Sequence, residues 1–309
     1  MNYNKCNCDL FTIISSIGKK EAAVKFMRLN EKAVLFVPDG TSEKDALYRT
    51  THLAISAHQD DIEFMAYAPI AECFGRNDRW FSGVVVSDGA GSPRSGLYAD
   101  YSDEDMKKIR ITEQKKAAYV GEYSVQILLG YPSKQVKDPK DHEIAQELAQ
   151  IIRETKPRYV YTHNLADKHD THIGTVIKVI EALRLLKEDE RPEKVFGCEV
   201  WRDLDWMPDE EKVFMDCGGH PNIAKCLSGV FDSQIVGGKR YELAAEGRRL
   251  ANATFSASHA CDTYSALNYA MDLTPLMLDK DLKVTDYVAG FIRRFEEGVC
   301  AKLLELSER

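Results

Sequence analysis

The chain has 309 residues, of which 44% are hydrophobic and 29% are charged, a balance typical of a globular protein. Its 49 acidic and 41 basic residues give a formal net charge of -8. This charge argues against a nucleic-acid partner, because a protein that binds nucleic acid shows a surplus of basic residues. No apolar run approaches the roughly 20 residues that cross a bilayer, so no membrane partner is expected. A chain of this length can bury about three-quarters of its unfolded surface and needs no disulfides or structural metals to fold.

The eight cysteines are scattered and form no CxxC pair. Cys6 and Cys8 are the nearest neighbours, but no second pair completes a zinc site with them. In a chain of this size, cysteines are expected to be reduced and mostly buried. The N-terminus lacks a basic-then-apolar signal pattern, so a cytoplasmic location is expected.

The predicted elements alternate between strands and helices. Strands are expected over 33–37, 52–57, 81–86, 125–129, 158–162 and 194–201. Helices are expected over 62–74, 102–120, 141–154 and 173–187. Ser102 and Asp105 form a capping signal at the start of the second helix. The chain beyond residue 206 is less regular, with a strand over 213–215 and helices over 221–230, 241–253 and 284–306.

This alternation predicts the α/β class, with a Rossmann-like layered fold. We expect a mostly parallel central sheet with helices on both faces. No Pro/Gly/Ser-rich linker divides the chain. We therefore expect an N-terminal extension over 1–48 and a single domain over 49–309 that includes a C-terminal elaboration.

Two clusters of histidine and aspartate follow predicted strands. The first comprises His58, Asp60 and Asp61, and the second comprises His163, His169 and His172. In open parallel sheets, ligands bind beyond the carboxyl ends of the strands. Both clusters are therefore expected at one edge of the sheet.

The spacing within the clusters suits a metal ion. His58 and Asp61 are three residues apart, as are His169 and His172. A catalytic zinc takes three nitrogen or oxygen ligands and leaves one position for water, so any three of these four suffice. The fourth residue and Asp60 are then available for proton transfer. The alternative is structural, with packed histidines and an Asp-Asp helix cap.

The clusters also resemble motifs of a known family. Ala57-His58-Gln59-Asp60-Asp61 is similar to the AHPDD signature of the PIG-L/LmbE-like deacetylases, with Gln59 in place of proline and Ile62 inserted before Glu63. His169-Asp170-Thr171-His172 resembles the HPDH motif of that family. Three further segments resemble the T-x-G, R-x-x-E and S-Q segments of that family in the same order. They are Val86-Ser87-Asp88-Gly89, Arg110-Ile111-Thr112-Glu113 and Asp232-Ser233-Gln234. The ordered matches cover about residues 50–235.

The resemblance implies a zinc-dependent hydrolase that removes an acetyl group from an N-acetylated amino sugar or sugar conjugate. It implies His58, Asp61 and His172 as metal ligands. It implies Asp60 as the general base for a zinc-activated water, and His169 as oxyanion stabiliser or acid. Arg110 is an implied substrate contact. Zn²⁺ is the expected ion, although a nitrogen and oxygen site also binds other divalent metals.

Further substrate contacts are expected from two loops and a strand end. Asp88 and Arg94 belong to a Gly/Ser-rich loop that is either a substrate lid or an ordinary mobile loop. Trp201 and Arg202 suit a sugar, although a surface turn anchored by tryptophans explains them equally well. His163 is expected to line the site. The segment 199–206, which contains Trp201 and Trp206, and the segment 237–241 also resemble an amino-sugar-related subgroup of the family.

Two other functions remain open at this point. One is a metallohydrolase of another amide or of a phosphoester, and the other is a non-catalytic sugar-binding protein on the same fold. The expected partner in each case is a small sugar-like molecule, N-acetylated if the enzyme is a deacetylase. The oligomeric state is open, and a homo-oligomer is compatible with the sequence.

Overall fold

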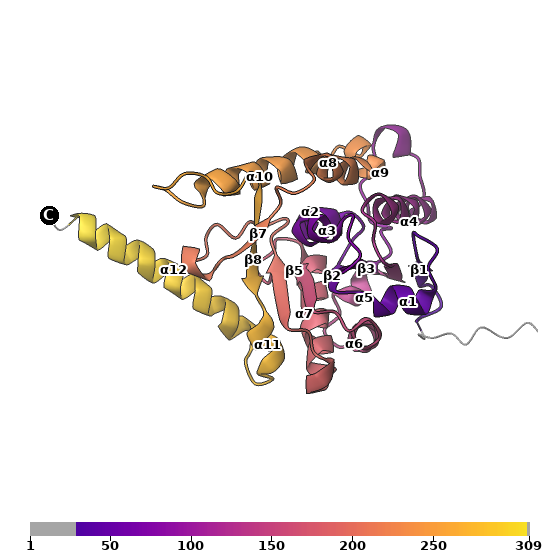
Figure 1. Ribbon diagram of the computed structural model, residues 1–309, viewed down its shortest axis with the longest axis horizontal. Helices are drawn as coiled ribbons and strands as arrows, with labels where there is room; N and C mark the ends of the chain where they lie inside the picture. The colour runs from indigo at the N-terminus through magenta and orange to yellow at the C-terminus, as the bar shows by residue number, and fades with distance from the viewer. Residues whose placement is uncertain (1–28, 308–309) are drawn as a thin grey trace, which may run out of the picture.

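A single mixed sheet organises the fold of the computed structural model, which describes residues 29–307 (Figure 1). The sheet has eight strands in the order β1-β4-β3-β2-β5-β6-β8-β7. The strands are β1 (Val34–Phe36), β2 (His52–Ser56), β3 (Phe81–Ser87), β4 (Gln126–Tyr131), β5 (Tyr159–His163), β6 (Lys194–Cys198), β7 (Val213–Asp216) and β8 (Leu267–Asp272). Cys6 and Cys8 lie outside the described residues.

The sheet is mostly parallel, as the alternation predicts. Strands β4, β3, β2, β5 and β6 run parallel, whereas β1, β8 and β7 join antiparallel to their neighbours. The sequence-based strand over 194–201 is too long, because β6 ends at Cys198. The structure also contains β8, which was not predicted.

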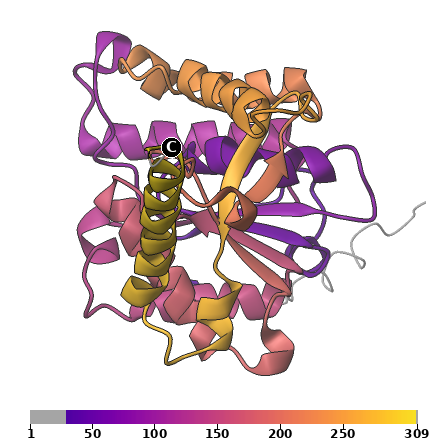
Figure 2. The same cartoon turned by 90° about the vertical axis from the view of Figure 1, so that its left-hand side faces the viewer.

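Helices cover both faces of the sheet, as expected (Figure 1). The upper layer in that view contains α2 (Asp61–Met65), α3 (Tyr67–Cys73), α4 (Asp103–Val120), α8 (Pro221–Gly229), α9 (Asp232–Val236) and α10 (Tyr241–Phe255). The lower layer contains α1 (Glu43–Tyr48), α5 (Ser133–Val136), α6 (Glu143–Thr155), α7 (Asp170–Leu185) and α11 (Thr274–Leu278). The last helix, α12 (Val284–Ser307), extends beyond the β7–β8 end of the sheet in Figure 1, and in Figure 2 it lies in the foreground.

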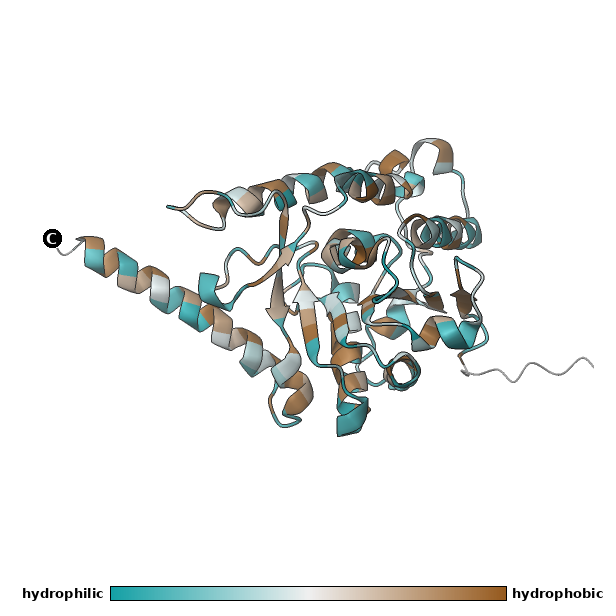
Figure 3. Cartoon of the chain, in the orientation of Figure 1, coloured by the Kyte–Doolittle hydropathy of each residue, from teal (hydrophilic) through white to brown (hydrophobic). Residues whose placement is uncertain are grey.

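The alternation of side chains along the buried strands builds two cores. In β2, Leu53 and Ile55 belong to the core under one helix layer, and Ala54 belongs to the core under the other. All three side chains are fully buried. A strand covered on both faces reads as a continuous apolar run, which is why β2 was recognisable in the sequence. In Figure 3 the outer helices alternate between hydrophobic and hydrophilic residues along their length.

The helices differ from the sequence-based expectation at two places that matter for the site. The helix expected over 62–74 is two helices, α2 and α3, with a break at Ala66. Pro69 explains the break, because it has no N–H and its ring would clash with the carbonyl of Met65 in a continuous helix. The helix expected over 173–187 begins earlier, at Asp170, so that His172 is helical. The capping box of Ser102 and Asp105 is confirmed.

The strand order reverses between β2 and β5. From β2 the chain moves outward through β3 and β4, and then returns to the other side of β2 to form β5. Crevices form at such reversals, outside the carboxyl ends of the strands. None of the helices described between residues 29 and 307 is both long enough and apolar enough to cross a membrane.

Candidate active site

The first cluster sits in a tight turn between β2 and α2. Asp60 has a φ of 87°, a backbone conformation that residues other than glycine rarely adopt. Its N–H donates to Gln114 Oε1 of α4 at 3.1 Å, which holds the turn in place. Ser56 Oγ donates to the carbonyl oxygen of His58 at 3.0 Å. The turn therefore holds His58 and Asp60 between the end of β2 and Asp61, the first residue of α2.

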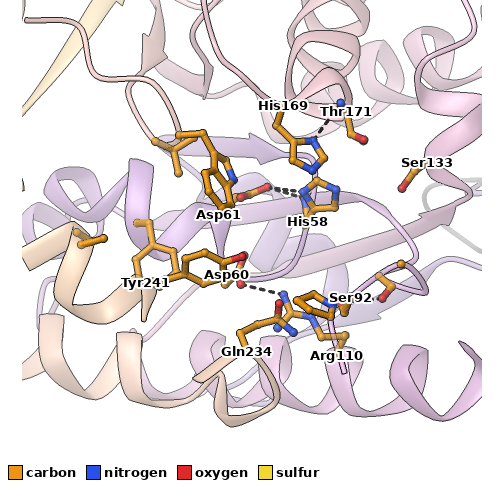
Figure 4. Close-up of a pocket in the computed structure, with 18 of the residues that line it drawn as sticks. His58, Asp60, Asp61, Ser92, Arg110, Ser133, His169, Thr171, Gln234 and Tyr241 are labelled. Carbon is orange, nitrogen blue, oxygen red and sulfur yellow. Dashed lines mark hydrogen bonds and ion pairs between the residues drawn. The ribbon is translucent and has the colours of Figure 1, made fainter. Parts of the chain in front are cut away.

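His58, Asp61 and His172 converge as the sequence predicts (Figure 4 shows the first two). His58 Nδ1 lies 3.2 Å from Asp61 Oδ2 and 3.2 Å from His172 Nε2, and His172 Nε2 lies 3.3 Å from Asp61 Oδ1. A tetrahedral zinc with bonds of about 2.0–2.1 Å spaces its ligand atoms about 3.3–3.4 Å apart. The contacts among the three residues therefore have the spacing of such a site, with Asp61 using a different carboxylate oxygen toward each histidine.

The same residues belong to two overlapping groups of potential metal ligands. One group is His58, His169 and His172, and the other is Asp61, His163 and His172. His163 Nε2 already accepts a hydrogen bond from the N–H of Ala57 at 2.8 Å, which occupies its lone pair. His58 is therefore the better third ligand beside Asp61 and His172.

A further carboxylate orients His172 from behind. Asp167 Oδ1 lies 3.4 Å from His172 Nδ1, and this carboxylate also accepts from the N–H groups of His169 at 2.9 Å and Trp201 at 3.3 Å. A carboxylate on the far nitrogen of a metal-binding histidine fixes the ring and increases its basicity. Sequence reasoning missed this role, because Asp167 lies in a loop without a recognisable spacing to His172.

The charges of the cluster are strongly interdependent. Burial alone would raise the pKa of Asp61, but His172 and His58 outweigh it and hold that pKa well below its usual range. Burial would lower the pKa of His172, but Asp61 and Asp167 raise it to about 9. A divalent cation suits this arrangement, because it can replace the proton that Asp61 and His172 otherwise stabilise.

Asp60 begins a separate chain of buried polar contacts. Arg110 Nη2 of α4 lies 3.1 Å from Asp60 Oδ2, and its Nη1 lies 3.0 Å from Glu113 Oε2. Glu113 in turn accepts from the N–H of Ser233 at 2.7 Å and from Ser233 Oγ at 2.8 Å. The R-x-x-E and S-Q segments thus meet in space. Arg110 is only 1% exposed, so its ion pair with Asp60 is largely shielded from solvent.

Burial has the largest effect on the pKa of Asp60. It raises the pKa of this carboxyl to about 7, although the guanidinium of Arg110 acts in the opposite direction. A carboxyl group of this acidity can both take up and release a proton near neutral pH.

His169 lies at the N-terminus of α7, beside the cluster. Its Nδ1 accepts from the N–H of Thr171 at 3.2 Å, so the proton of the neutral ring is on Nε2. Its ring centroid lies 4.8 Å from that of His58. Burial, reinforced by His58 and His172, lowers the pKa of His169 to about 4. A neutral His169 can therefore offer Nε2–H as a hydrogen-bond donor near pH 7.

A pocket of about 520 Å³ opens in front of these groups. Its lining includes four of the predicted catalytic and metal-binding residues, namely His58, Asp60, Asp61 and His169. Arg110 and Trp201 also line it, as do Gly89, Gly91, Ser92 and Pro93 of the glycine-rich loop. Figure 4 shows Asp60 and Arg110 on one side of the pocket and His58 with His169 on another.

The structure does not bring the other predicted substrate contacts into the lining. Arg94 turns away, to Asp103 and to the carbonyl of Ala90. Asp88 accepts from the N–H of Ala90 and lies 3.3 Å from Lys107 Nζ. Arg202 is exposed outside the pocket. His163 is fully buried behind the cluster, with its ring stacked on His172 at 3.9 Å.

Several other lining residues were not predicted as site residues. They include Phe64, Lys137, Glu199, Gln234, Tyr241 and Arg248. The signal for Glu199 was available, because it follows the end of β6 at the same edge of the sheet. Tyr241 and Arg248 come from α10, whose position above the pocket depends on long-range packing.

Gln59 and Gly89 form a matched contact beneath the pocket. A Cβ on Gly89 would lie 2.5 Å from Gln59 Oε1, and the φ of Gly89 is +74°. Gln59 Nε2 donates to the carbonyl of Ser87 at 3.3 Å. The absence of a side chain at Gly89 therefore leaves room for the Gln59 amide. The inserted Ile62 is fully buried, and Glu63 contacts Gln114 and Tyr123.

Comparisons with known proteins agree with this fold. The conserved protein TT1542 from Thermus thermophilus has a TM-score of 0.57 and 17% identity, over 76% of this chain and 100% of that chain. An N,N'-diacetylchitobiose deacetylase from Pyrococcus horikoshii has a TM-score of 0.59 and 15% identity, over 77% of this chain and 88% of that chain.

A third similar structure is the 4-carboxy-2-hydroxymuconate hydratase GalB from Pseudomonas putida KT2440. It has a TM-score of 0.55 and 17% identity, over 72% of this chain and 96% of that chain. At these identities the similarity shows the fold alone, and a deacetylase and a hydratase share it. A search of curated proteins found no match.

A family model described as "PIG-L: GlcNAc-PI de-N-acetylase" matches residues 53–183. This range includes both histidine and aspartate clusters, and it confirms the resemblance drawn from the motifs. Residues 53–183 of the chain are therefore similar to the PIG-L family.

Proposed function

We propose that the protein is a metal-dependent hydrolase that removes the acetyl group from an N-acetylated amino sugar or sugar conjugate. The observation that carries the proposal is the convergence of His58, Asp61 and His172 beside the pocket that Asp60 and His169 line. Their side chains make contacts of 3.2–3.3 Å with one another, and Asp61 uses one carboxylate oxygen toward each histidine. A sugar-binding protein has no need for these two proton-handling groups beside a metal site.

We propose Zn²⁺ as the ion. The donor set of two imidazoles and one carboxylate suits zinc, although other divalent ions bind such sites. A divalent cation here supplies Lewis acidity, which polarises the amide carbonyl and lowers the pKa of water toward about 7.

In this proposal Asp60 is the general base. Its carboxylate takes a proton from water while the water oxygen forms a bond to the acetyl carbon. Arg110 holds the carboxylate in position through their contact at 3.1 Å. When the C–N bond breaks, the same proton passes from Asp60 to the departing nitrogen. The products are acetate and the free amine of the sugar.

His169 is proposed to stabilise the charge that develops on the carbonyl oxygen. Its Nδ1 is occupied by the N–H of Thr171, which leaves Nε2–H free to donate. A fixed donor at this position lowers the barrier, because it needs no reorganisation as the charge develops.

The fold supports the same proposal. The clusters lie where the strand order reverses between β2 and β5, which is the ligand-binding position of a Rossmann-like sheet. We propose residues 49–309 as one such domain, with residues 1–48 as an extension.

The test is acetate release from N-acetylated amino sugars by the zinc-loaded protein and by its Asp60→Asn and His58→Ala variants. We expect both to lose about 10²–10⁴-fold in kcat. Asp203→Asn, at an exposed position, is the matched control. Undiminished acetate release by the two variants contradicts the proposal. If another amide or a phosphoester is cleaved and no acetate appears, the protein is a different metallohydrolase.

A further inference from the structure

The turn that carries Asp60 has an unusual backbone conformation. Between residues 29 and 307, the residues other than glycine with a positive φ are Asp60, Glu122, Lys156 and His220. Asp60 is buried, whereas the other three are exposed. Its φ of 87° and ψ of -32° lie near those of the third residue of a type II turn, about 80° and 0°, where glycine is favoured. A buried residue of the pocket therefore carries this backbone strain.

The strain at Asp60 could be relieved by rotation of a single peptide group. In a type I turn the third residue has a φ of about -90°, which suits residues with a side chain. The two turn types differ by a rotation of the peptide group between the second and third residues, which here joins Gln59 to Asp60. The surrounding structure must therefore hold this peptide group against that rotation.

Helix α4 holds both ends of the peptide group. Arg110 Nη2 donates to the carbonyl oxygen of Gln59, and Gln114 Oε1 accepts from the N–H of Asp60 at 3.1 Å. Arg110 and Gln114 are four residues apart, so they lie on the same face of the helix. Arg110 is 1% exposed and Gln114 is fully buried, so water does not compete for either bond.

The amide of Gln114 is itself fixed in one orientation. Its Nε2 donates to Glu63 Oε1 at 2.8 Å and to Gln126 Oε1 at 3.4 Å. Tyr123 also donates to Glu63 Oε1, at 2.8 Å. A rotated amide would set the Gln114 oxygen against Glu63 and its NH2 group against the N–H of Asp60. The neighbours of Gln114 therefore keep its oxygen directed at Asp60.

Rotation of the peptide group would also disturb the carboxylate of Asp60. It would turn the N–H of Asp60 toward the guanidinium of Arg110, so that two donors faced each other, and it would remove the carbonyl of Gln59 from that guanidinium. Arg110 Nη2 lies 3.1 Å from Asp60 Oδ2, and this contact would be lost with the bond to the carbonyl. The position of the carboxylate therefore depends on the strained form of the turn.

We propose that Gln114 is a positioning residue for the general base. By accepting from the N–H of Asp60, it keeps the strained turn in which the Asp60 carboxylate contacts Arg110 and lines the pocket. The inference rests on the proposed function, which makes Asp60 the base. Gln114 is fully buried behind the turn and does not line the pocket, so it acts only through Asp60.

The first test is steady-state kinetics of the zinc-loaded protein with the N-acetylated substrate that the wild type cleaves best. Gln114→Met keeps the length of the side chain and removes the acceptor. We expect kcat to fall about 10–100-fold, because a displacement of about 1 Å at a reacting group has an effect of this size. KM and Zn²⁺ affinity should change by less than about twofold, since neither depends on the base. Gln114→Glu keeps an oxygen that can accept from Asp60 and should retain kcat within about fivefold.

Gln126→Met is the matched control for the loss of a buried amide. Gln126 is fully buried in the same polar cluster and donates to the carbonyl of Ile127 at 3.1 Å, but its printed partners do not include Asp60. We expect this variant to melt at a lower temperature while kcat stays near that of the wild type. An equal fall of kcat in Gln114→Met and Gln126→Met overturns the inference, because the loss would then follow stability. Equal losses in Gln114→Met and Gln114→Glu also overturn it.

Two further measurements need no turnover. Hydrogen exchange at the amide of Asp60 should be about tenfold faster in Gln114→Met than in the wild type, with no change at Ile55 in β2. A crystal structure of zinc-loaded Gln114→Met should show a negative φ at Asp60 and no contact with Arg110. A positive φ with that contact intact overturns the inference. If the wild type releases no acetate from any substrate, the proposed function fails, and these two measurements still decide whether Gln114 holds the turn.

Discussion

Asp167 offers a sharp test of the metal cluster, because it touches His172 without lining the pocket. Its Oδ1 lies 3.4 Å from His172 Nδ1, and its side chain is fully shielded from solvent. Asp167→Asn keeps the size of the side chain and removes the charge. We expect Zn²⁺ affinity to fall about 10–100-fold, or about 1.4–2.8 kcal/mol, the usual cost of losing such a carboxylate.

The geometry explains why the loss is not larger. His58 and Asp61 keep their positions, since neither contacts Asp167, and the asparagine oxygen can still accept one backbone N–H. The assay is competition for Zn²⁺ against a chelating dye at pH 7.5, which needs no substrate. Asp170→Asn, exposed in the first turn of α7, is the control and keeps wild-type affinity. An affinity of Asp167→Asn within twofold of wild type, in a protein that melts normally, refutes the reasoning.

Three further predictions concern stability. Gly89→Ala should lower the free energy of unfolding by about 1–3 kcal/mol in urea, because φ is +74° and the new Cβ meets Gln59 Oε1 at 2.5 Å and Arg110 Cγ at 3.1 Å. Adding Gln59→Ala should recover only the part due to Gln59, and an unchanged midpoint of Gly89→Ala contradicts this. Burial lowers the pKa of His52 to about 4 from 6.5, so the unfolded chain binds a proton that the folded chain does not, and stability falls as pH drops from 6.5 toward 4. His52→Gln should remove about 2–3 kcal/mol of this decline, and parallel pH curves for the two proteins would disprove it. Arg110→Met leaves Asp60 and Glu113 without their buried partner and should lower the free energy of unfolding by about 3–5 kcal/mol. A second change, Glu113→Gln, should restore part of this loss. An Arg110→Met variant as stable as wild type argues against the ion-pair chain.

The parallel core of the sheet was predictable, whereas its antiparallel edge was not. Strands such as β2 and β3 are short apolar runs bounded by turn signals, and burial on both faces makes them stand out. By contrast, β8 reads Leu-Asn-Tyr-Ala-Met-Asp and has no β-branched residue, so no local preference marks it as a strand. Its pairing with β6 and β7 comes from tertiary packing.

The convergence of these histidines and aspartates was predictable in outline, because they follow strands that end at the same edge of the sheet. The position of His58 after β2 and of His172 after β5 follows from the order of the elements. The wall of the pocket was harder, since Tyr241 and Arg248 lie on a helix whose sequence pattern says nothing about what it covers. Arg94 shows the opposite error: a basic residue in a glycine-rich loop suggested a ligand contact, but Asp103 nearby provides its partner.

The pairing of β2 with β5 has a consequence for how the protein folds. Ala57 and His163 are 106 residues apart in the chain, and His58 and His172 are 114 apart, yet each pair is in contact. Any opening of this strand pair separates the donor atoms, so the unfolded chain has no equivalent site. A cation held there therefore acts as a cross-link that exists only in the native state and stabilises it by RT ln(1 + [M]/Kd), about 2.7 kcal/mol at a hundredfold excess over Kd. The midpoint of thermal unfolding should then report the occupancy of the cluster directly, independently of any reaction that takes place in the pocket.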